Sequence, residues 1–459
     1  MGESTPTEAE CGVPHLLVEA GALRLDEIVE VRNMLAKYET DETLGQVVQT
    51  QDVLLQRAVQ RIYNNSPFYR TKLDKAGISP GEIRTVEDLD SVPLTDKEEL
   101  RLEYPLGLMA VPEEDVVRIH SSSGTTGKPI IVPYTKRDVQ IWAEMMARSL
   151  ELAGVKGRDR VQVTPGYGLW TAGTGFQAGV EHLGAMAIPT GPGNTEKQLE
   201  MMTDLGTTVL IGTSSYGLLL AEEIKKHNLN DELRLKIGIF GSERWGDKMR
   251  RRIEDILGIE TFDIYGLTEI YGPGIAIDCA VHKGLHYWSD HLLFEIVDLD
   301  TGRQLPPGVE GELVITTLTK EGMPLLRYRT HDITRIHLEA CSCGCPYPRI
   351  DRILGRTDDM FKVKGVNIYP GQIDHVLSLT KEIGSEYQII LTRVEGKDSL
   401  LIKVEGLAGA EDGRLALKCQ RNIKTRIGIL ANVEVVLYGS LPRSEKKSKR
   451  VFDLRDQGL

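Results

Sequence analysis

Apolar residues follow two alternating patterns between residues 136 and 264. In some segments they recur every three to four residues, which is typical of amphipathic helices. In the segments between, they form short runs that are typical of buried strands. This alternation predicts a mostly parallel sheet flanked by helices, with a ligand crevice at the carboxyl ends of the strands. The predicted helices are 136–152, 195–205, 217–227 and 248–257, and the predicted strands are 161–164, 185–188, 208–211, 235–240 and 260–264.

The pattern differs on both sides of this segment. Residues 1 to about 50 are polar and predicted to be helical, and from residue 285 onward we expect longer strands, at 291–297, 311–318 and 333–337. An amphipathic helix that ends near residues 64–67 has one apolar face, formed by Leu54, Leu55, Ala58, Val59 and Ile62.

A small α+β unit is expected at the C-terminal end of the chain. Its strands are predicted at 387–394, 400–404 and 433–437, and its helix has an apolar face formed by Leu415, Cys419, Ile423 and Ile427. We place a domain boundary near Asp358. The predicted fold class is therefore α/β, with a large domain over residues 1–357 that includes a β-rich subdomain, and a small, mobile α+β domain over residues 358–459.

Composition and charge narrow the classes of function. The formal charge of the 459-residue chain is −12, which repels nucleic acid and anionic membranes. The N-terminus has no signal-peptide pattern, and the chain has no run of about 18 apolar residues that would cross a membrane. We therefore expect a cytoplasmic protein with neither a membrane segment nor a nucleic-acid partner. Its six cysteines are expected to be thiols or metal ligands rather than disulfides.

A loop rich in hydroxyl groups and glycine separates two predicted strands, 116–119 and 130–132. Glycine lets the backbone approach a ligand, and exposed N–H groups and hydroxyls can bind an anion. Ser122 and Pro129 depart from the ordinary P-loop, so we predict a phosphate loop of another kind, with a flexible surface turn as the alternative. The loop consists of Ser121, Ser122, Ser123, Gly124, Thr125, Thr126, Gly127 and Lys128.

Five further stretches follow this loop in order, at residues 241–243, 265–269, 328–332, 355–359 and 442–451. With the loop, they resemble the adenylate-forming acyl-CoA synthetase and ligase superfamily, and most closely its phenylacetate-CoA ligase branch, over nearly the whole chain. The joint match is more specific than any single motif. The resemblance implies that the large domain binds ATP and an acid, and that ATP, Mg²⁺ and coenzyme A take part in the reaction.

The resemblance also assigns roles around the nucleotide. Tyr265 stacks on the adenine, Thr268 contacts phosphate, and Glu269 binds Mg²⁺, a hard cation that prefers carboxylate and phosphate oxygens. Asp332 is assigned to the ribose, because one carboxylate can accept hydrogen bonds from two adjacent hydroxyls. The other residues assigned to the nucleotide are Gly241, Ser242, Glu243, Gly266 and Arg356, of which residues 241–243 could instead form only a turn before a helix.

The last two stretches are assigned to domain motion and catalysis. By resemblance, Asp358 is the hinge about which the C-terminal domain swings between two half-reactions. Lys447 is our choice for the adenylation lysine and Lys449 is the reserve, because Lys446 stands where the family usually has glycine. The alternative for this stretch is a solvated basic tail.

The resemblance also implies that the acid binds beside residues 166–171, which follow the predicted strand 161–164. Three departures from the branch change this pocket: Trp170 replaces the usual Phe, Pro165 replaces an aromatic residue, and Gln177 replaces a His. An aromatic or arylacetic acid is the first expectation, and a smaller or hydroxylated acid is the alternative. The residues assigned to the acid are Tyr167, Gly168, Trp170 and Gln177.

A second group of residues suits a structural zinc ion. Soft thiolates together with an imidazole are typical ligands of tetrahedral Zn²⁺. The expected ligands are Cys279, His282, Cys341 and Cys343, with Cys345 or His286 able to replace one of them and free thiols as the alternative.

The predicted reaction follows from the chemistry of carboxylates. Attack of the acid on the α-phosphate of ATP converts its oxygen into part of a good leaving group, AMP, and the thiol of coenzyme A then takes the acyl group. Lysine and Mg²⁺ are suited to stabilise the charge on the phosphoryl oxygens. The alternatives are an adenylating enzyme with another acceptor and a nucleotide-binding regulator. We also expect a homodimer.

Overall fold

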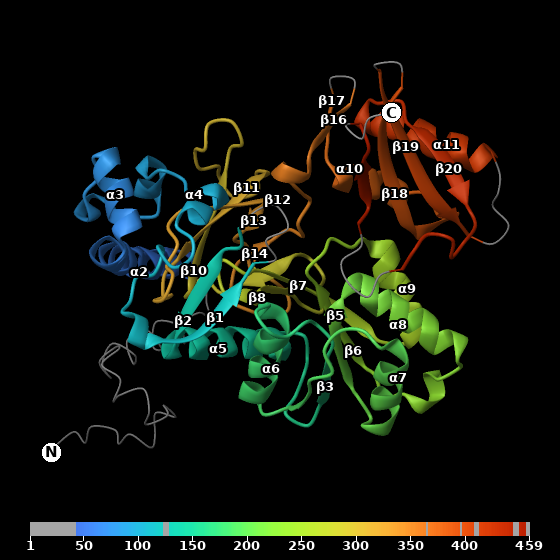
Figure 1. Cartoon of the computed structure of the whole chain (residues 1–459), viewed down its shortest axis with the longest axis horizontal. Coiled ribbons are helices and arrows are strands. Elements are labelled where there is room, and N and C mark those ends of the chain that lie inside the picture. The colour runs from blue at the N-terminus through green and yellow to red at the C-terminus, as the bar shows by residue number, and fades with distance from the viewer. Residues whose placement is uncertain are drawn as a thin grey trace.

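The computed structural model describes residues 43–122, 128–363, 366–394, 397–407, 413–443 and 449–455 (Figure 1). Its centre is a nine-stranded sheet in the order β13-β14-β9-β8-β7-β6-β5-β3-β4. Strands β3 to β7 pair in parallel, and β8, β9, β14 and β13 extend the sheet in antiparallel fashion. The strands are β3 (Arg160–Val163), β4 (Met186–Ile188), β5 (Val209–Thr213), β6 (Ile237–Gly241), β7 (Glu260–Leu267), β8 (Gly272–Asp278), β9 (Leu285–Tyr287), β13 (Ile336–His337) and β14 (Arg349–Ile350).

Helices cover both faces of this sheet, as successive residues of β5 illustrate. Val209 and Ile211 belong to the hydrophobic core shared with α5 and α6, whereas Leu210 belongs to a second core with α7, α8 and α9. Because side chains alternate across a strand, a continuous apolar run fills both layers. The helices are α5 (Lys136–Leu152), α6 (Thr171–Leu183), α7 (Thr195–Asp204), α8 (Ser214–Lys226) and α9 (Asp247–Leu257).

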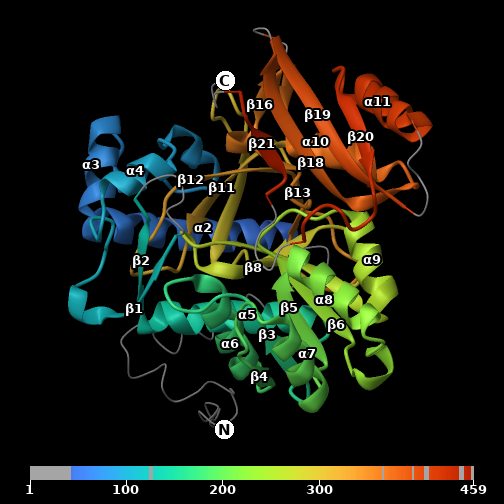
Figure 2. The same cartoon turned by 45° about the vertical axis from the view of Figure 1, so that its right-hand side comes forward.

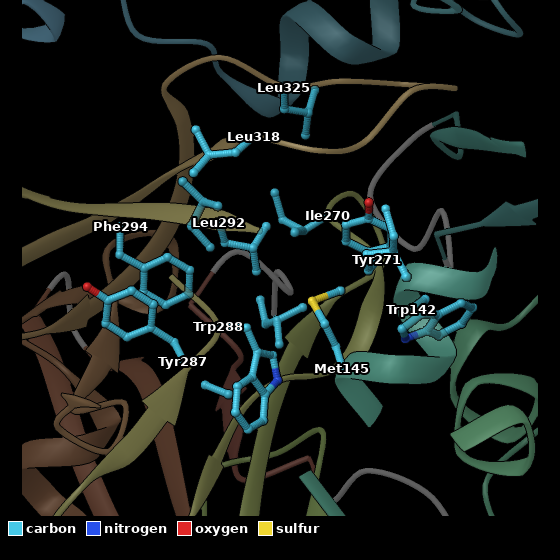
Figure 3. Close-up of a cluster of buried hydrophobic side chains, with 14 of the residues drawn as sticks. Trp142, Met145, Ile270, Tyr271, Tyr287, Trp288, Leu292, Phe294, Leu318 and Leu325 are labelled. Atoms are coloured by element: carbon cyan, nitrogen blue, oxygen red, sulfur yellow. The ribbon is translucent and has the colours of Figure 1, made fainter. Parts of the chain in front are cut away.

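The N-terminal helices pack on a four-stranded antiparallel sheet in the order β10-β11-β12-β15. Helix α3 begins after Ser66, whose hydroxyl accepts a hydrogen bond from Tyr69 N, and it ends at Gly77 with φ of 69°. Figure 3 shows part of the shared core, where the rings of Tyr287 and Phe294 stack with centroids 4.1 Å apart. The elements are α2 (Thr43–Asn65), α3 (Pro67–Ala76), α4 (Lys97–Leu102), β10 (Leu292–Val297), β11 (Gly311–Thr317), β12 (Tyr328–Thr334) and β15 (Gly355–Arg356).

The C-terminal domain has its own hydrophobic core, drawn from residues 361–451. Its four-stranded sheet has the order β20-β19-β18-β21, and β16 and β17 form a separate hairpin. Figures 1 and 2 both show this domain lying over α8 and α9 of the large domain. Its elements are β16 (Phe361–Val363), β17 (Val366–Ile368), α10 (Pro370–Ser378), β18 (Ile383–Val394), β19 (Lys397–Gly406), α11 (Gly413–Ile427), β20 (Asn432–Val436) and β21 (Val451–Asp453).

The expected α/β class with a small α+β C-terminal domain is confirmed, but individual elements differ from the prediction. Helix α6 is missing from the predicted elements, because its glycines blur the helical pattern. Strand β12 begins at Tyr328, earlier than expected, and a break after Thr334 separates it from β13. The predicted helix over the first 50 residues lies largely outside the described residues.

Candidate active site

The β1–β2 hairpin carries the predicted phosphate loop, with β1 at Val116–Ser121 and β2 at Ile131–Thr135. Ser122 closes the neck of this loop: its N–H donates to Ile130 O at 3.0 Å, and its Oγ accepts from Ile130 N at 2.9 Å. Ser121 N donates to Leu169 O at 2.9 Å, which joins the hairpin to the predicted acid loop. The side chain of Lys128 is exposed, with its Nζ 5.2 Å from the centre of the Tyr104 ring. Ser123, Gly124, Thr125, Thr126 and Gly127 lie outside the described residues.

Two glycines allow close backbone approaches at the carboxyl ends of β6 and β7. A Cβ atom on Gly241 would lie 2.2 Å from Ile264 O, and one on Gly266 would lie 1.9 Å from Gly272 O. Both distances are far below van der Waals contact, so neither position accepts a side chain without moving the backbone.

The two residues after Gly241 differ in what they can offer a ligand. Ser242 is exposed and has φ of 67°. The Oε1 atom of Glu243 accepts hydrogen bonds from Ser214 Oγ at 3.1 Å and Ser215 N at 2.6 Å. Its carboxylate therefore lies at the positive N-terminus of α8, where a negative charge is favourable.

Asp332 is the centre of a buried network, with only 4% of its surface exposed. Its carboxylate accepts hydrogen bonds from Tyr265 Oη at 2.6 Å and from Arg356 Nη1 at 2.8 Å. Residues 332 and 356 are paired directly across β12 and β15, which fixes their side chains on one face. Burial raises the pKa of Asp332, and Arg356 opposes this shift.

The same arginine holds the predicted hinge residue. Arg356 Nε and Nη2 donate to the two carboxylate oxygens of Asp358, at 2.8 and 2.9 Å. Burial acts to raise the pKa of Asp358, but the arginine outweighs it and the pKa is lowered. His331 has φ of 63°, a left-handed conformation that glycine adopts more easily, and its Nδ1 lies 2.9 Å from Thr357 Oγ1.

Glu269 and Thr268 lie in the turn between β7 and β8. The Glu269 side chain is 5% exposed, and its Oε1 lies 3.0 Å from Lys97 Nζ at the start of α4. Thr268 Oγ1 lies 3.5 Å from Thr171 Oγ1 at the start of α6. The strand-end turn therefore contacts both the N-terminal helices and the acid loop.

Lys320 lies beneath this turn and is fully buried. Its Nζ donates to the carbonyl oxygens of Glu269, at 3.4 Å, and Ile270. The same Nζ lies 4.6 and 4.8 Å from the ring centres of Tyr134 and Tyr271, respectively. Sequence reasoning missed both Lys97 and Lys320, because each lies in a charged segment that is typical of exposed loops and helix starts.

The predicted acid residues lie in the loop between β3 and α6 and on α6 itself. Burial raises the pKa of Tyr167 to about 12, and its Oη is buried without a hydrogen-bond partner among the described residues. Gly168 has φ of 87°. Trp170 is 48% exposed and immediately precedes α6. Gln177 lies further along that helix, where its Nε2 donates to Glu181 Oε1 at 2.8 Å.

A cluster of three cysteines and one histidine forms at the antiparallel end of the large sheet. One potential ligand atom from each of Cys279, His286, Cys341 and Cys343 lies within 4.8 Å of every other. Cys343 Sγ is 3.3 Å from His286 Nε2. His286 Nδ1 lies 2.7 Å from the carbonyl oxygen of Tyr347, which favours the tautomer whose Nε2 lone pair faces the cluster.

His282, which the sequence suggested as a ligand, is not among the four residues of this cluster. Its Nδ1 lies 2.8 Å from both Arg250 Nη1 and Asp278 Oδ2, which form a buried ion pair. His286, which the sequence left as a substitute, takes its place in the cluster, because β9 runs beside β8 and β14.

None of the helices in the described part of the chain combines the length and hydrophobicity needed to cross a membrane. Residues 30–319 match the family model of AMP-binding enzymes, and residues 365–455 match that of the AMP-binding enzyme C-terminal domain.

Three curated relatives are named phenylacetate-coenzyme A ligase. The protein from Thermus thermophilus is 44% identical over 88% of this chain and 96% of its own length. The proteins from Pseudomonas putida and Escherichia coli are 43% and 42% identical over 88% and 90% of this chain, and over 95% of their own lengths.

A solved structure of 2-hydroxyisobutyryl-CoA ligase in its postadenylation state gives a TM-score of 0.83 at 29% identity, covering 92% of both chains. The same relative in its thioesterification state gives a TM-score of 0.66 at 29% identity, covering 90% of this chain and 91% of the other. This chain belongs to the AMP-binding enzyme family, in its phenylacetate-CoA ligase branch.

Proposed function

We propose that the protein is an ATP-dependent, AMP-forming acid:CoA ligase that acts on an aromatic or arylacetic acid resembling phenylacetate. The observation that carries this proposal is the buried carboxylate of Asp332 on β12, which accepts hydrogen bonds from Tyr265 of β7 and Arg356 of β15. It lies in a chain that is 44% identical to a phenylacetate-coenzyme A ligase.

The donors around Asp332 are suited to be exchanged for a nucleotide. The two hydroxyls of a ribose can replace protein donors on one carboxylate without leaving a buried charge unpaired. Arg356 retains its contacts with Asp358 during this exchange. We assign Tyr265, Gly266 and the backbone of residues 241–243 to the adenine.

Glu269 fits the proposed magnesium site because it is a buried carboxylate whose present counter-charge is a lysine, Lys97. Bound Mg²⁺ would neutralise negative charge on the phosphoryl oxygens. We assign Thr268 and the 121–128 loop to the phosphates, and Lys447, which lies outside the described residues, to the α-phosphate.

The reaction proceeds in two steps in this proposal. A carboxylate oxygen of the acid attacks the α-phosphorus and pyrophosphate leaves, giving an acyl-adenylate. The sulfur of coenzyme A then attacks the acyl carbon, AMP leaves with the oxygen, and the thiol proton is released. We propose that residues 358–459 rotate about Asp358 between these steps.

The acid is assigned to the pocket beside Tyr167, Gly168 and Trp170. A small hydroxylated acid is the second candidate, because the 2-hydroxyisobutyryl-CoA ligase structure covers 92% of this chain. The buried Tyr167 hydroxyl could serve either class. Gln177 contacts Glu181 in its own helix, and we assign it only to the outer wall of the pocket.

Exchange of labelled pyrophosphate into ATP tests the proposed function. The assay should run over a panel that contains phenylacetate, benzoate and 2-hydroxyisobutyrate. We expect the greatest acid-dependent exchange with phenylacetate, and thioester formation once coenzyme A is added. Exchange without thioester would indicate another acceptor, and no exchange with any acid would refute adenylation.

We propose that the cluster of Cys279, His286, Cys341 and Cys343 holds a structural zinc ion. The donor set fits zinc in number and in softness, and Tyr347 orients the imidazole. One zinc per chain in protein purified without chelator is expected, and substoichiometric zinc would contradict it. We further propose that the protein is a cytoplasmic homodimer, which light scattering and cell fractionation would test.

A further inference from the structure

Glu222 of α8 contacts side chains of the C-terminal domain. Tyr438 Oη donates to its Oε1 at 2.9 Å, and Arg443 Nε donates to its Oε2 at 3.1 Å. Arg252 of α9 donates to the same Oε1 from the large-domain side at 3.1 Å. One carboxylate from the large domain therefore accepts hydrogen bonds from two side chains of the C-terminal domain.

Arg443 is fixed by its own domain before it reaches Glu222. Its Nη1 and Nη2 donate to the two carboxylate oxygens of Glu405, at 2.9 and 3.0 Å. Glu405 is fully buried, and it also accepts from Leu441 N at 2.9 Å. Paired carboxylate contacts of this kind give a guanidinium a defined orientation. Arg443 thus presents its remaining edge to Glu222 as part of a rigid unit.

The aromatic ring of Tyr438 reinforces the contact. The guanidinium carbon of Arg252 lies 4.5 Å from the centre of this ring, and that of Arg443 lies 5.8 Å away. A second contact lies at the start of α9, where Lys248 Nζ donates to the carbonyl oxygens of Thr380 and Ile383. These contacts are polar, so water can replace them when the domains separate.

The position of Arg443 in the chain connects this interface with the chemistry. It lies four residues before Lys447, the residue assigned to the α-phosphate. The domain arrangement is also closer to the postadenylation structure of 2-hydroxyisobutyryl-CoA ligase than to its thioesterification structure.

We propose that Glu222, with Arg443 and Tyr438, is a positioning site that holds the C-terminal domain in the orientation needed for adenylation. The contact acts through Lys447 and touches neither substrate nor cofactor. It must break when the domain rotates for thioester formation. Because Arg443 keeps its pair with Glu405 and water can hydrate Glu222, which is 22% exposed, breaking it leaves no buried charge unpaired. This inference rests on the proposed two-step function.

The test measures the two half-reactions separately in wild type and in Glu222→Gln. Adenylation is followed as pyrophosphate exchange, and thioester formation as the reaction of supplied acyl-adenylate with coenzyme A. We expect exchange to fall about three- to tenfold, as for the loss of a partly exposed charged contact. Thioester formation should stay within twofold of wild type or increase. Tyr438→Phe should have a smaller effect and lower pyrophosphate exchange relative to thioester formation by about twofold.

Glu223→Gln is the matched control. Glu223 is the neighbouring residue on α8, and it contacts Lys226 of the same helix and His227, which caps the end of that helix. We expect both half-reactions to match wild type in this variant. Equal losses of both half-reactions in Glu222→Gln, or exchange as high as in Glu223→Gln, would overturn the proposal. Failure of the wild type to exchange with any acid would instead refute the proposed function.

Discussion

The proposed nucleotide region, which contains Asp332 and Glu269, and the cysteine cluster are both buried and polar, but they differ in how their charges are balanced. In the nucleotide region Asp332 is paired with Arg356, and Glu269 is paired with Lys97. In the cluster Cys279 Sγ faces Cys341 Sγ at 3.9 Å, with no basic side chain among the four candidate ligands except His286.

The difference indicates what each region is built to bind. A buried charge is costly unless it is paired, so the nucleotide region is stable before its ligand arrives and can exchange partners with it. Burial raises the pKa of Cys279 to about 12, so its thiolate requires a nearby cation. The proposed nucleotide region therefore suits a substrate that binds reversibly, and the cysteine cluster suits a metal ion that stays bound.

The largest expected effect lies on the nucleotide side and concerns the predicted adenylation lysine. Lys447→Ala should reduce acyl-adenylate formation on the order of 10²–10³-fold, because it removes a cation from the charged transition state. It should still convert supplied acyl-adenylate and coenzyme A into thioester. Lys449→Ala is the control, since Lys449 Nζ lies 5.3 Å from the centre of the Phe452 ring in its own domain. If Lys449→Ala showed the larger loss, the two assignments would have to be exchanged.

Asp332→Asn should impair the use of ATP without affecting the fold. Loss of a charged acceptor should lower kcat/KM for ATP roughly 10- to 100-fold. Arg356 keeps its pair with Asp358, so the melting temperature should change little. Steady-state kinetics and thermal unfolding check the two halves of this prediction. A large fall in melting temperature with unchanged kinetics would indicate a purely structural carboxylate.

Cys279→Ser should lower stability and leave catalysis largely unchanged, the opposite of the result expected for Asp332→Asn. Zinc content should fall well below one per chain, and the protein should lose roughly 2–4 kcal/mol of stability. Activity per folded molecule should remain close to that of wild type, because the Asp332 carboxylate is held by Tyr265 and Arg356 and not by a residue of the cluster. Cys345→Ser is the control, since Cys345 is outside the group of four candidate ligands. A full zinc complement in Cys279→Ser would exclude the assigned ligand set.

Lys320 is a buried basic residue for which the structure shows no salt bridge within the described residues. We expect its effect on stability to be the smallest of these predictions. Burial lowers its pKa to about 7, whereas an unfolded lysine titrates near 10.4. Between these pH values the unfolded chain binds a proton that the folded protein lacks, so stability from this residue rises with pH. The stability of wild type relative to Lys320→Met should rise by up to about 1.4 kcal/mol per pH unit between pH 7.5 and 9. A difference that does not vary with pH would show that the folded protein retains this proton.

Periodicity predicts most elements of the fold because the apolar runs and helical faces of residues 136–264 pack as their patterns indicate. Helix α6 was not predicted because Gly173, Gly175 and Gly179 interrupt its pattern of apolar residues. The structure explains them: a Cβ atom on Gly175 would lie 2.1 Å from the Trp142 ring, and one on Gly179 would lie 2.1 Å from Met146. Close helix packing, which no local pattern reveals, selects glycine there.

The candidate site shows a similar limit. Motif order was sufficient to nominate Tyr265, Asp332 and Arg356, which the structure brings into one network. The choice between His282 and His286 depended on strand pairing between distant segments, which spacing along the chain does not encode. Lys97 and Lys320 acquire their contacts only in three dimensions, from segments that look exposed in the sequence.

The most direct test of adenylation is a single turnover without coenzyme A. Enzyme in excess over ATP, with Mg²⁺ and phenylacetate, should form acyl-adenylate and pyrophosphate in equal amounts, detected by mass spectrometry and a pyrophosphate assay. Added coenzyme A should then convert the adenylate to thioester and AMP. Release of ADP and phosphate, or thioester formation without an intervening adenylate, would contradict the proposed mechanism.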